Sequence, residues 1–301
     1  MHTILTTEPS AEYELIDSGG GEKLERYGPV LVSRPDPQAL WERRAPERAK
    51  GAQAVFGQVP GRRPGWRLAP GLPPRWPVEL GGLRFLVKPT SFKHIGLFPE
   101  QASNWEWIGE RIRGAARPVS VINLFGYTGG ATLAAARAGA EVCHVDASKV
   151  ATAWAHDNAR LSGLGEAPIR WIVEDVRSFL KREERRGRRY DGIIMDPPAF
   201  GHGPGGELWK IEDDFLKLVS LAFSTLSPNP LFALMNGYAS GYSAIAYENN
   251  LLPLAERFGG VLESGELTIR ESLAGRLLPC GIFARWSAAL PPSSDEDSLR
   301  G

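Results

Sequence analysis

Three apolar runs in the middle of this chain end in acidic residues: first Asp146, then Glu174 with Asp175, and then Asp196. The runs are Glu141–Val145, Ile169–Val173 and Tyr190–Met195. Carboxylates accept hydrogen bonds from hydroxyl, amine and amide groups. In an open parallel α/β sheet the carboxyl ends of the strands share one edge, and ligands bind in the crevice outside it. The spacing therefore predicts that these carboxylates lie along one binding edge.

A glycine-rich turn comes before these acidic positions. Val119–Phe125 is apolar and predicts a buried strand, and Thr128–Ala138 predicts a helix. Gly126, Gly129 and Gly130 lie at the junction of the two. Glycine permits positive φ and a close approach of the backbone to a ligand, and a helix N-terminus offers free N–H groups. The turn predicts a cofactor site, although its G-x-x-G-G spacing differs from the G-x-G-x-x-G of dinucleotide-binding folds.

Two roles are open for Asp146 on the residues alone. It follows the first glycine of the turn by about 20 residues, where doubly wound folds place an acidic residue on ribose hydroxyls. Asp146 or Ser148 could instead cap the helix that extends through Ala159. The two roles are compatible.

The segment from Asp196 to Phe200 reads Asp-Pro-Pro-Ala-Phe and could face a substrate. A carboxylate there can orient an acceptor N–H or take up its proton, and Phe200 can stack on a flat base. Pro197 and Pro198 stiffen the loop and offer carbonyl acceptors. The alternative is that the prolines only end a strand and Phe200 packs in the core. Because this segment follows the fourth strand in the series, we favour the functional interpretation.

These motifs resemble those of class I S-adenosylmethionine-dependent methyltransferases. The motifs are Asn123-Leu124-Phe125-Gly126-Tyr127-Thr128-Gly129-Gly130, Asp146-Ala147-Ser148, Glu174-Asp175 and Asp196-Pro197-Pro198-Ala199-Phe200. The first motif is most similar to that of the branch containing the large-subunit ribosomal RNA base methyltransferases. The resemblance extends from Phe92 to Trp286. It implies an α/β, Rossmann-like seven-stranded sheet of order 3-2-1-4-5-7-6 with S-adenosylmethionine as cofactor.

The resemblance also implies roles for individual residues. The turn from Phe125 to Gly129 would hold the methionine end of the cofactor, Asp146 its ribose and Asp175 its adenine amino group. The methyl acceptor would face Asp196, Pro197, Pro198 and Phe200. The full set of implied cofactor-binding residues is Asn123, Phe125, Gly126, Tyr127, Thr128, Gly129, Asp146, Ala147, Ser148, Asp175 and Val176.

Departures from the family pattern limit which methyl-transfer reactions we expect. The cytosine-C5 methylating members use a cysteine after the fifth strand, but the corresponding segment here, Leu234–Ala239, contains none. Cys143 lies within an apolar run and Cys280 in a segment that resembles the final hairpin. We therefore expect a nitrogen acceptor and no cysteine nucleophile. In Gly96–Ala102, Ala102 replaces an arginine that is common in relatives, so that contact stays open.

Composition excludes several classes of protein. The chain has 301 residues, 43% hydrophobic and 23% charged, with a formal net charge of zero. No apolar run approaches the ~18 residues of a membrane span, and Met1–Ser10 lacks the features of a secretory signal. Two cysteines in a chain of this length fit a reducing cytoplasm. No Cys/His cluster has metal-ligand spacing, and the five histidines are scattered; His202, close to Phe200, is the one worth testing.

Composition and residue pattern divide the chain into three parts. Residues 1–90 are rich in Gly, Pro and short alternating runs, which predicts a small β-rich domain with one possible helix at Pro37–Lys50. Residues 91–288 form the expected catalytic domain. It is predicted to begin with a helix over Phe92–Arg113 and to end with a hairpin of Val261–Ile269 and Leu277–Trp286. Residues 289–301 are polar and predict a disordered tail.

Two basic clusters are relevant to whether the chain binds RNA. Residues 1–95 carry 14 Lys/Arg and 10 Asp/Glu, a net charge of +4, and Arg62–Arg67 interleaves basic and aromatic residues as an RNA-binding loop does. Lys181–Arg189 is a second cluster. Both clusters could equally be solvated faces, and the solvated alternative is favoured for the second.

Three hypotheses follow. The leading one is a methyltransferase on RNA, with ribosomal RNA as the favoured partner and the N-terminal part as a docking surface. The second is a methyltransferase on a protein or a small molecule, which suits the neutral net charge. The third is a cofactor-binding assembly factor. The sequence does not specify the target nucleotide, the methylated atom or the oligomeric state.

Overall fold

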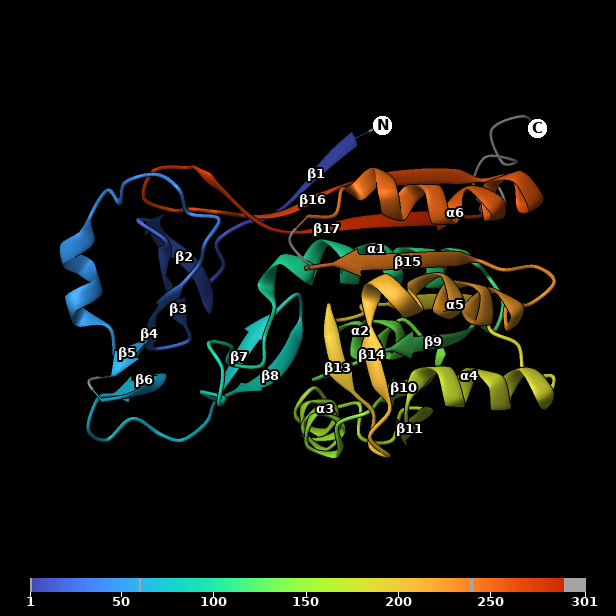
Figure 1. The fold of residues 1–301 in the computed structure, drawn as a ribbon, viewed down its shortest axis with the longest axis horizontal. Coiled ribbons are helices and arrows are strands. Elements are labelled where there is room, and N and C mark those ends of the chain that lie inside the picture. Colours follow the sequence, from blue (N-terminus) through green and yellow to red (C-terminus); the bar gives the residue numbers. More distant parts are fainter. Residues whose placement is uncertain (1, 60, 239–240, 290–301) are drawn as a thin grey trace, which may run out of the picture.

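The computed structural model describes residues 2–59, 61–238 and 241–289, and the predicted tail at 289–301 lies almost entirely outside them. Eight strands form one large sheet (Figure 1). They are β1 (His2–Thr7), β9 (Ser120–Leu124), β10 (Glu141–Asp146), β11 (Ile169–Val173), β12 (Gly192–Met195), β15 (Phe232–Gly237), β16 (Val261–Arg270) and β17 (Leu277–Ser287). Their order is β1-β16-β17-β15-β12-β9-β10-β11.

The large sheet has the predicted topology. Counted from β9 along the chain, and leaving out β1 and the short hairpin after β12, its seven strands lie in the order 3-2-1-4-5-7-6. The pairs from β11 through β15 are parallel, whereas β17 is antiparallel to both β15 and β16. The predicted terminal hairpin is confirmed. The carboxyl ends of β9, β10, β11 and β12 consequently share one edge.

Helices cover both faces of this sheet. They are α1 (Ala102–Gly114), α2 (Gly130–Arg137), α3 (Lys149–Leu161), α4 (Val176–Arg185), α5 (Ile211–Ser224) and α6 (Ala244–Phe258). Because side chains alternate along a strand, Ile122 and Leu124 pack with α4, α5 and α6, and Val121 packs with α1 and α2. Each central strand is buried on both sides, which explains its continuous apolar sequence.

The N-terminal part contains two smaller sheets. One has five strands, β2 (Tyr13–Gly19), β3 (Glu22–Tyr27), β4 (Val30–Pro35), β5 (Ala54–Val59) and β6 (Arg62–Leu68). The other is the hairpin of β7 (Trp76–Leu80) and β8 (Leu83–Val87), which Figure 1 shows between the five-stranded sheet and the large one. The prediction that the N-terminal part is rich in β-strands is confirmed.

Three predicted boundaries are corrected by the structure. His2–Thr7 is not part of the N-terminal unit, because β1 pairs with the otherwise open edge of β16 in the large sheet. Pro37–Lys50 is not a helix, and only a 3₁₀ turn forms at Pro46–Gly51. The helix expected from Phe92 begins at Ala102, after a 3₁₀ turn at Pro99–Gln101, since proline is tolerated only in the first turn of a helix.

Hydrogen bonds connect the N-terminal part to the rest. The amide of Leu86 in β8 donates to Asn158 Oδ1 at 2.8 Å, and its carbonyl accepts from Trp154 Nε1 at 2.7 Å. Both partners belong to α3. At the far end of the β16–β17 hairpin, Glu271 Oε1 accepts from the Ser18 amide at 2.6 Å. No helix of the described residues is long and apolar enough to cross a membrane.

A buried carboxylate joins three strands of the five-stranded sheet. Glu25 is fully buried and accepts hydrogen bonds from the hydroxyls of Tyr13 and Tyr27, each at 2.9 Å, and from Arg34 Nε at 2.7 Å. Burial would raise the pKa of Glu25, but Arg34, Lys23 and these hydrogen bonds lower it to about 2. The folded state therefore depends on Glu25 being ionised.

We predict that Glu25→Gln destabilises the protein by about 3 kcal/mol, because it leaves Arg34 buried without its counter-charge. The matched control is Glu14→Gln, which breaks a partly exposed pair with Arg26 and should cost less than about 1 kcal/mol. Because the folded pKa of Glu25 is depressed, its contribution is complete above pH 4.5 and is lost as the pH falls toward 2. Urea unfolding of both variants at neutral pH measures the difference, and equal losses would contradict the assignment.

Candidate cofactor and acceptor site

The glycine turn after β9 is tightly folded. The Gly126 amide donates to the Val145 carbonyl at 3.1 Å, and the Gly129 amide donates to the Gly126 carbonyl at 2.9 Å. Phe125, Tyr127 and Gly129 have φ values of 58°, 45° and 92°. Positive φ is rare for aromatic residues and persists where the surrounding structure enforces it. The turn therefore holds its backbone in a fixed shape at the N-terminus of α2.

Polar side chains support the turn from below. Asn123 Nδ2 donates to Thr132 Oγ1 at 2.9 Å, and this hydroxyl lies 2.9 Å from His144 Nδ1. All three side chains are buried, and burial lowers the pKa of His144 to about 3, so its ring is neutral. A Cβ at Gly126 would lie only 2.4 Å from the His144 ring. Asn123, predicted to bind the cofactor, is thus placed to support the turn.

Asp146 connects the turn to the end of β10. Its Oδ2 accepts from the Tyr127 amide and its Oδ1 from the Ser148 amide, both at 2.8 Å. Burial raises the pKa of Asp146, and the two amide hydrogen bonds oppose that rise. Ser148 caps α3, because its Oγ accepts from the Ala151 amide at 3.2 Å. The predicted cap is therefore Ser148, and Ala147 lies between the two.

These residues fit S-adenosylmethionine. A carboxylate offers about four lone-pair positions, so Asp146 can accept ribose hydroxyls in addition to two amides. The amides at the start of α2 and the tight Phe125–Gly129 turn suit a polar ligand. Thr128 is fixed by its hydroxyl, which donates to the Gly96 carbonyl at 2.7 Å.

Asp175 and Val176 lie at the next strand end. The Asp175 carboxylate caps α4 by accepting from the amides of Arg177 and Ser178, and it lies 3.1 Å from Arg177 Nη2. Val176 is 2% exposed and packs in the core with α4. The side chain of Val176 thus belongs to the core, and its contact with the cofactor stays a prediction.

The acceptor segment lies next to the turn. Met195 pairs with Leu124, so β12 delivers Asp196 beside the end of β9. Phe200 is 56% exposed at the start of the hairpin of β13 (Phe200–His202) and β14 (Leu208–Lys210). Phe200 is thus free of the core, as the functional interpretation requires.

Two neighbours modify the expectation for this segment. The Pro198 carbonyl is already used, because it accepts from Trp209 Nε1 at 2.6 Å. Trp209 is buried, and its ring centre lies 5.2 Å from that of Phe125. The hairpin is thereby held against the turn. The rings of His202 and Phe200 are in edge contact at 5.1 Å, which places His202 at the acceptor side.

A polar group beside Asp196, at the end of β15, was not predicted from the sequence. Gln101 Nε2 donates to the Tyr238 hydroxyl at 2.7 Å, and Gln101 Oε1 accepts from Asn104 Nδ2 at 3.0 Å. Asn104 also donates to Asn236 Oδ1 at 3.0 Å. Asn236 and Tyr238 come at and after the end of β15, so the strand-end rule that found Asp146 and Asp196 could have found them.

Glu100 was also not predicted from the sequence. It is buried, burial raises its pKa, and its charge helps to raise the pKa of Asp196. Desolvation is the larger cause, and together they bring the pKa of Asp196 to about 7. A carboxylate with a pKa close to the working pH can exchange protons efficiently.

Both cysteine thiols have a raised pKa. Cys143 is buried in β10, and burial raises the pKa of its thiol to about 11. Burial and the charge of Glu100 also raise the pKa of the Cys280 thiol. Within the described part of the chain, no three His, Cys, Asp or Glu side chains are grouped to hold a metal ion.

Comparisons with known proteins agree with this geometry. A family model described as S-adenosylmethionine-dependent methyltransferase matches residues 66–249. A crystal structure of a SAM-dependent methyltransferase from Agrobacterium tumefaciens is 44% identical, with a TM-score of 0.90 over 95% of this chain and 94% of that one.

Two curated relatives carry ribosomal RNA names. Ribosomal RNA large subunit methyltransferase K/L of Syntrophotalea carbinolica is 32% identical over 54% of this chain and 22% of its own length. Ribosomal RNA large subunit methyltransferase K of Neisseria meningitidis is 30% identical over 54% of this chain and 46% of its own length. The chain thus spans less than half of either relative.

We predict that Gly126→Ala weakens S-adenosylmethionine binding at least tenfold and destabilises the fold by about 1 to 3 kcal/mol, because the added methyl collides with the buried His144 ring. Gly51→Ala is the control, since a Cβ there meets nothing within 4 Å. Calorimetric titration and thermal unfolding measure both effects. If the two variants behaved alike, the proposed support of the turn by His144 would be wrong.

Proposed function

Since this chain belongs to the S-adenosylmethionine-dependent methyltransferase family, we propose that it methylates a nitrogen of a ribosomal RNA base without a cysteine nucleophile. The observation that carries the proposal is the acceptor side of the site. A partly buried carboxylate, Asp196, lies beside an exposed aromatic ring, Phe200, at the strand end next to the cofactor turn. The proposal places the reaction in the cytoplasm.

The residues divide into a cofactor side and an acceptor side. The Phe125–Gly129 turn and Asp146 hold S-adenosylmethionine, and Asp175 lies at the next strand end for its adenine. Bound S-adenosylmethionine supplies an electrophilic methyl group on a sulfonium. Phe200 stacks on the acceptor base, and ionised Asp196 accepts a hydrogen bond from the acceptor N–H and receives the proton that this nitrogen loses. Positioning reacting groups within ~3–3.5 Å provides much of the rate enhancement in such reactions.

Several features support a nitrogen acceptor. Attack on a pyrimidine carbon in this family needs a cysteine after β15, and Asn236 and Gly237 end that strand. Burial raises the pKa of both thiols, so thiolates are disfavoured. The acceptor side instead presents oxygen acceptors, which match the N–H groups of a base.

The names of the two curated relatives support RNA as the acceptor. The exposed Phe200 ring supports a flat substrate, because aromatic stacking is a common means of binding unpaired bases. A protein or small-molecule acceptor is the alternative, and the zero net charge of the chain favours it. A role as a cofactor-binding assembly factor is the third possibility.

The test is transfer of labelled methyl from S-adenosylmethionine to total RNA from a strain that lacks this gene. Label in RNA with the wild-type protein, located on a base nitrogen by nucleoside digestion, is the expected result. Label that enters only protein or small molecules would contradict the proposal. Cofactor binding without any transfer would favour the assembly role.

We predict that Asp196→Asn lowers methyl transfer about a hundredfold or more, because the amide cannot take up the acceptor proton. In the wild type the rate should rise with pH through about 7, as the Asp196 carboxylate becomes ionised. Asp213→Asn, on the exposed side of α5, is the control and should keep the wild-type rate and profile. An unchanged pH profile in Asp196→Asn would exclude Asp196 as the proton acceptor.

A further inference from the structure

A pocket of about 350 Å³ lies between β8 and the first half of α3. Its lining includes three cations, Arg75, Lys88 and Lys149, and one carboxylate, Asp157. The sum of these charges is +3 − 1 = +2, although the whole chain is neutral. This pocket is separate from the turn and from Asp196, and neither of the proposed roles above uses its residues.

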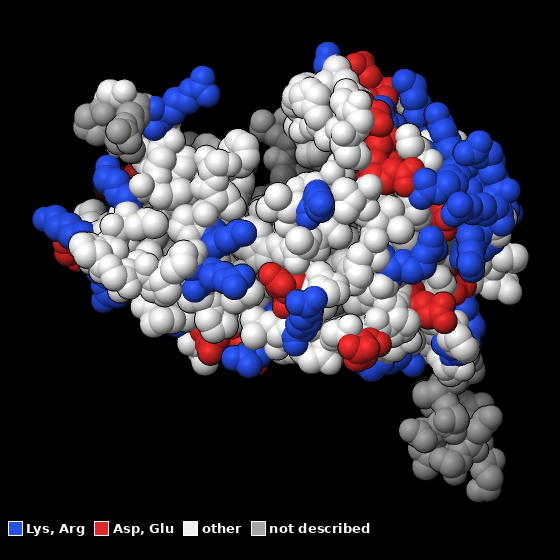
Figure 2. Space-filling view, turned by 90° about the horizontal axis from the view of Figure 1, so that it is seen from below, with Lys and Arg blue, Asp and Glu red and all other residues white. Residues whose placement is uncertain are grey.

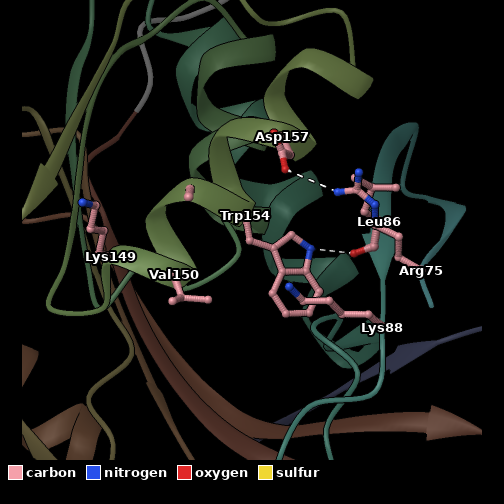
Figure 3. A pocket seen from close by; sticks show the side chains of 8 residues that line it. Arg75, Leu86, Lys88, Lys149, Val150, Trp154 and Asp157 are labelled. Atoms are coloured by element: carbon pink, nitrogen blue, oxygen red, sulfur yellow. Dashed lines mark hydrogen bonds and ion pairs between the residues drawn. The ribbon is translucent and has the colours of Figure 1, made fainter.

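The cations surround an apolar middle. In Figure 3, Lys149 lies at one end of the pocket and Arg75 at the other, with Val150 and Trp154 between them. Lys88 Nζ lies 4.2 Å from the centre of the Trp154 ring, and Arg75 lies 3.8 Å from Asp157. Val150 is 69% exposed, so its side chain offers apolar surface to a bound molecule. The pocket therefore alternates positive, apolar and positive surface.

Trp154 connects the pocket to the methyltransferase site. Its ring centre lies 6.2 Å from that of Tyr127 in the glycine turn. A Cβ at Gly96 would lie 2.2 Å from the same ring, so the Gly96 segment packs directly on it. Lys149 comes three residues after Asp146 in the chain. A molecule in this pocket thus lies next to the cofactor side of the active edge.

A basic and aromatic surface continues from the pocket. A loop runs from Lys88 to Ile95 and is closed by a hydrogen bond of 3.0 Å from the Lys88 amide to the Ile95 carbonyl. Phe92 in this loop is 71% exposed. Trp66 Nε1 donates to the carbonyls of Thr90 and Phe92, each at 2.9 Å. This ties the loop to β6, which carries the exposed Arg63 and Arg67.

We infer that this pocket binds one nucleotide of the RNA substrate outside the methylated base, with a phosphate at each end. Lys149 takes one phosphate, Arg75 and Lys88 take the next, and the sugar or base between them lies on Val150 and Ala153. An RNA strand has the same alternation of charged phosphate and uncharged nucleoside. This inference rests on the proposed function, because it assigns the RNA a path from the Arg63 region to Asp196.

The dense basic cluster Lys181–Arg189 is a weaker candidate for this role. Figure 2 shows a large group of Lys and Arg side chains at the end of the molecule where Figure 1 draws α4. Arg182 pairs with Glu174 and Arg186 with Glu183, as Arg75 does with Asp157 in the pocket, so the location of the cluster decides between the two surfaces. The cluster also lies along and after α4, which leads away from the carboxyl edge back to the start of β12.

The test compares Lys149→Glu with Lys181→Glu. Both residues are exposed lysines in helices. Because the substitution is the same at both positions, the two variants have the same net charge. Lys149 is the first residue of α3, where a negative charge favours the helix dipole, so Lys149→Glu should fold at least as stably as the wild type. Thermal unfolding checks this point.

Binding of a fluorescent single-stranded oligoribonucleotide of mixed sequence is then measured over a series of salt concentrations. We expect Lys149→Glu to weaken binding about tenfold at low salt and to reduce the slope of log affinity against log salt by about 0.7 for the lost phosphate contact. Lys181→Glu should match the wild type. Lys88→Gln combined with Lys149→Glu should reduce the slope by about 1.4.

Other results would overturn the inference in distinguishable ways. If the wild type binds and methylates RNA but the two single variants lose affinity equally, the pocket is not the RNA site and the proposed function stands. If the wild type shows no salt-dependent RNA binding, both fail. If Lys149→Glu loses affinity for a polyglutamate peptide and not for RNA, the pocket belongs to an acidic protein partner.

Discussion

The site depends first on the Asp146 carboxylate, which accepts hydrogen bonds from the amides of Tyr127 and Ser148. These two bonds fix the glycine turn of β9 against the end of β10. Without them, the positive φ values of Phe125 and Tyr127 would lose the contact that offsets their strain. The buried contacts of Asn123, Thr132 and His144 support the same turn from below. One anion thus organises the backbone that we propose as the cofactor-binding turn.

The second constraint is the chemistry of a partly buried acid. Asp196 is kept weakly acidic by desolvation and by Glu100, and this cost is met by the packing of the sheet around it. Because its folded pKa lies above the ordinary value, ionisation of Asp196 lowers stability as the pH rises toward 7. The protein therefore loses some stability over the pH range in which, in the proposed reaction, the carboxylate becomes able to accept a proton. Such conflicts between stability and local environment are typical of functional sites.

Much of the fold was predictable because β9, β10, β11 and β12 are short apolar runs with strand-ending residues on both sides. The strand-end rule then placed Asp146, Asp175 and Asp196 along one edge. The same rule was not applied after β15, so Asn236 and Tyr238 were missed. Glu100 could not be found by pattern, since it comes from a 3₁₀ turn whose position depends on tertiary contacts. The place of β1 was equally hidden, because an edge strand pairs with whichever edge is open.

Asp146 fixes the turn, and we propose that it also binds the ribose of S-adenosylmethionine. Calorimetric titration of the cofactor against the wild type, Asp146→Asn and the exposed control Asp213→Asn tests this most directly. We expect at least a tenfold loss of affinity for Asp146→Asn, because the amide cannot accept two N–H groups and the ribose hydroxyls together, and no loss for Asp213→Asn. Equal affinity in all three proteins would contradict it.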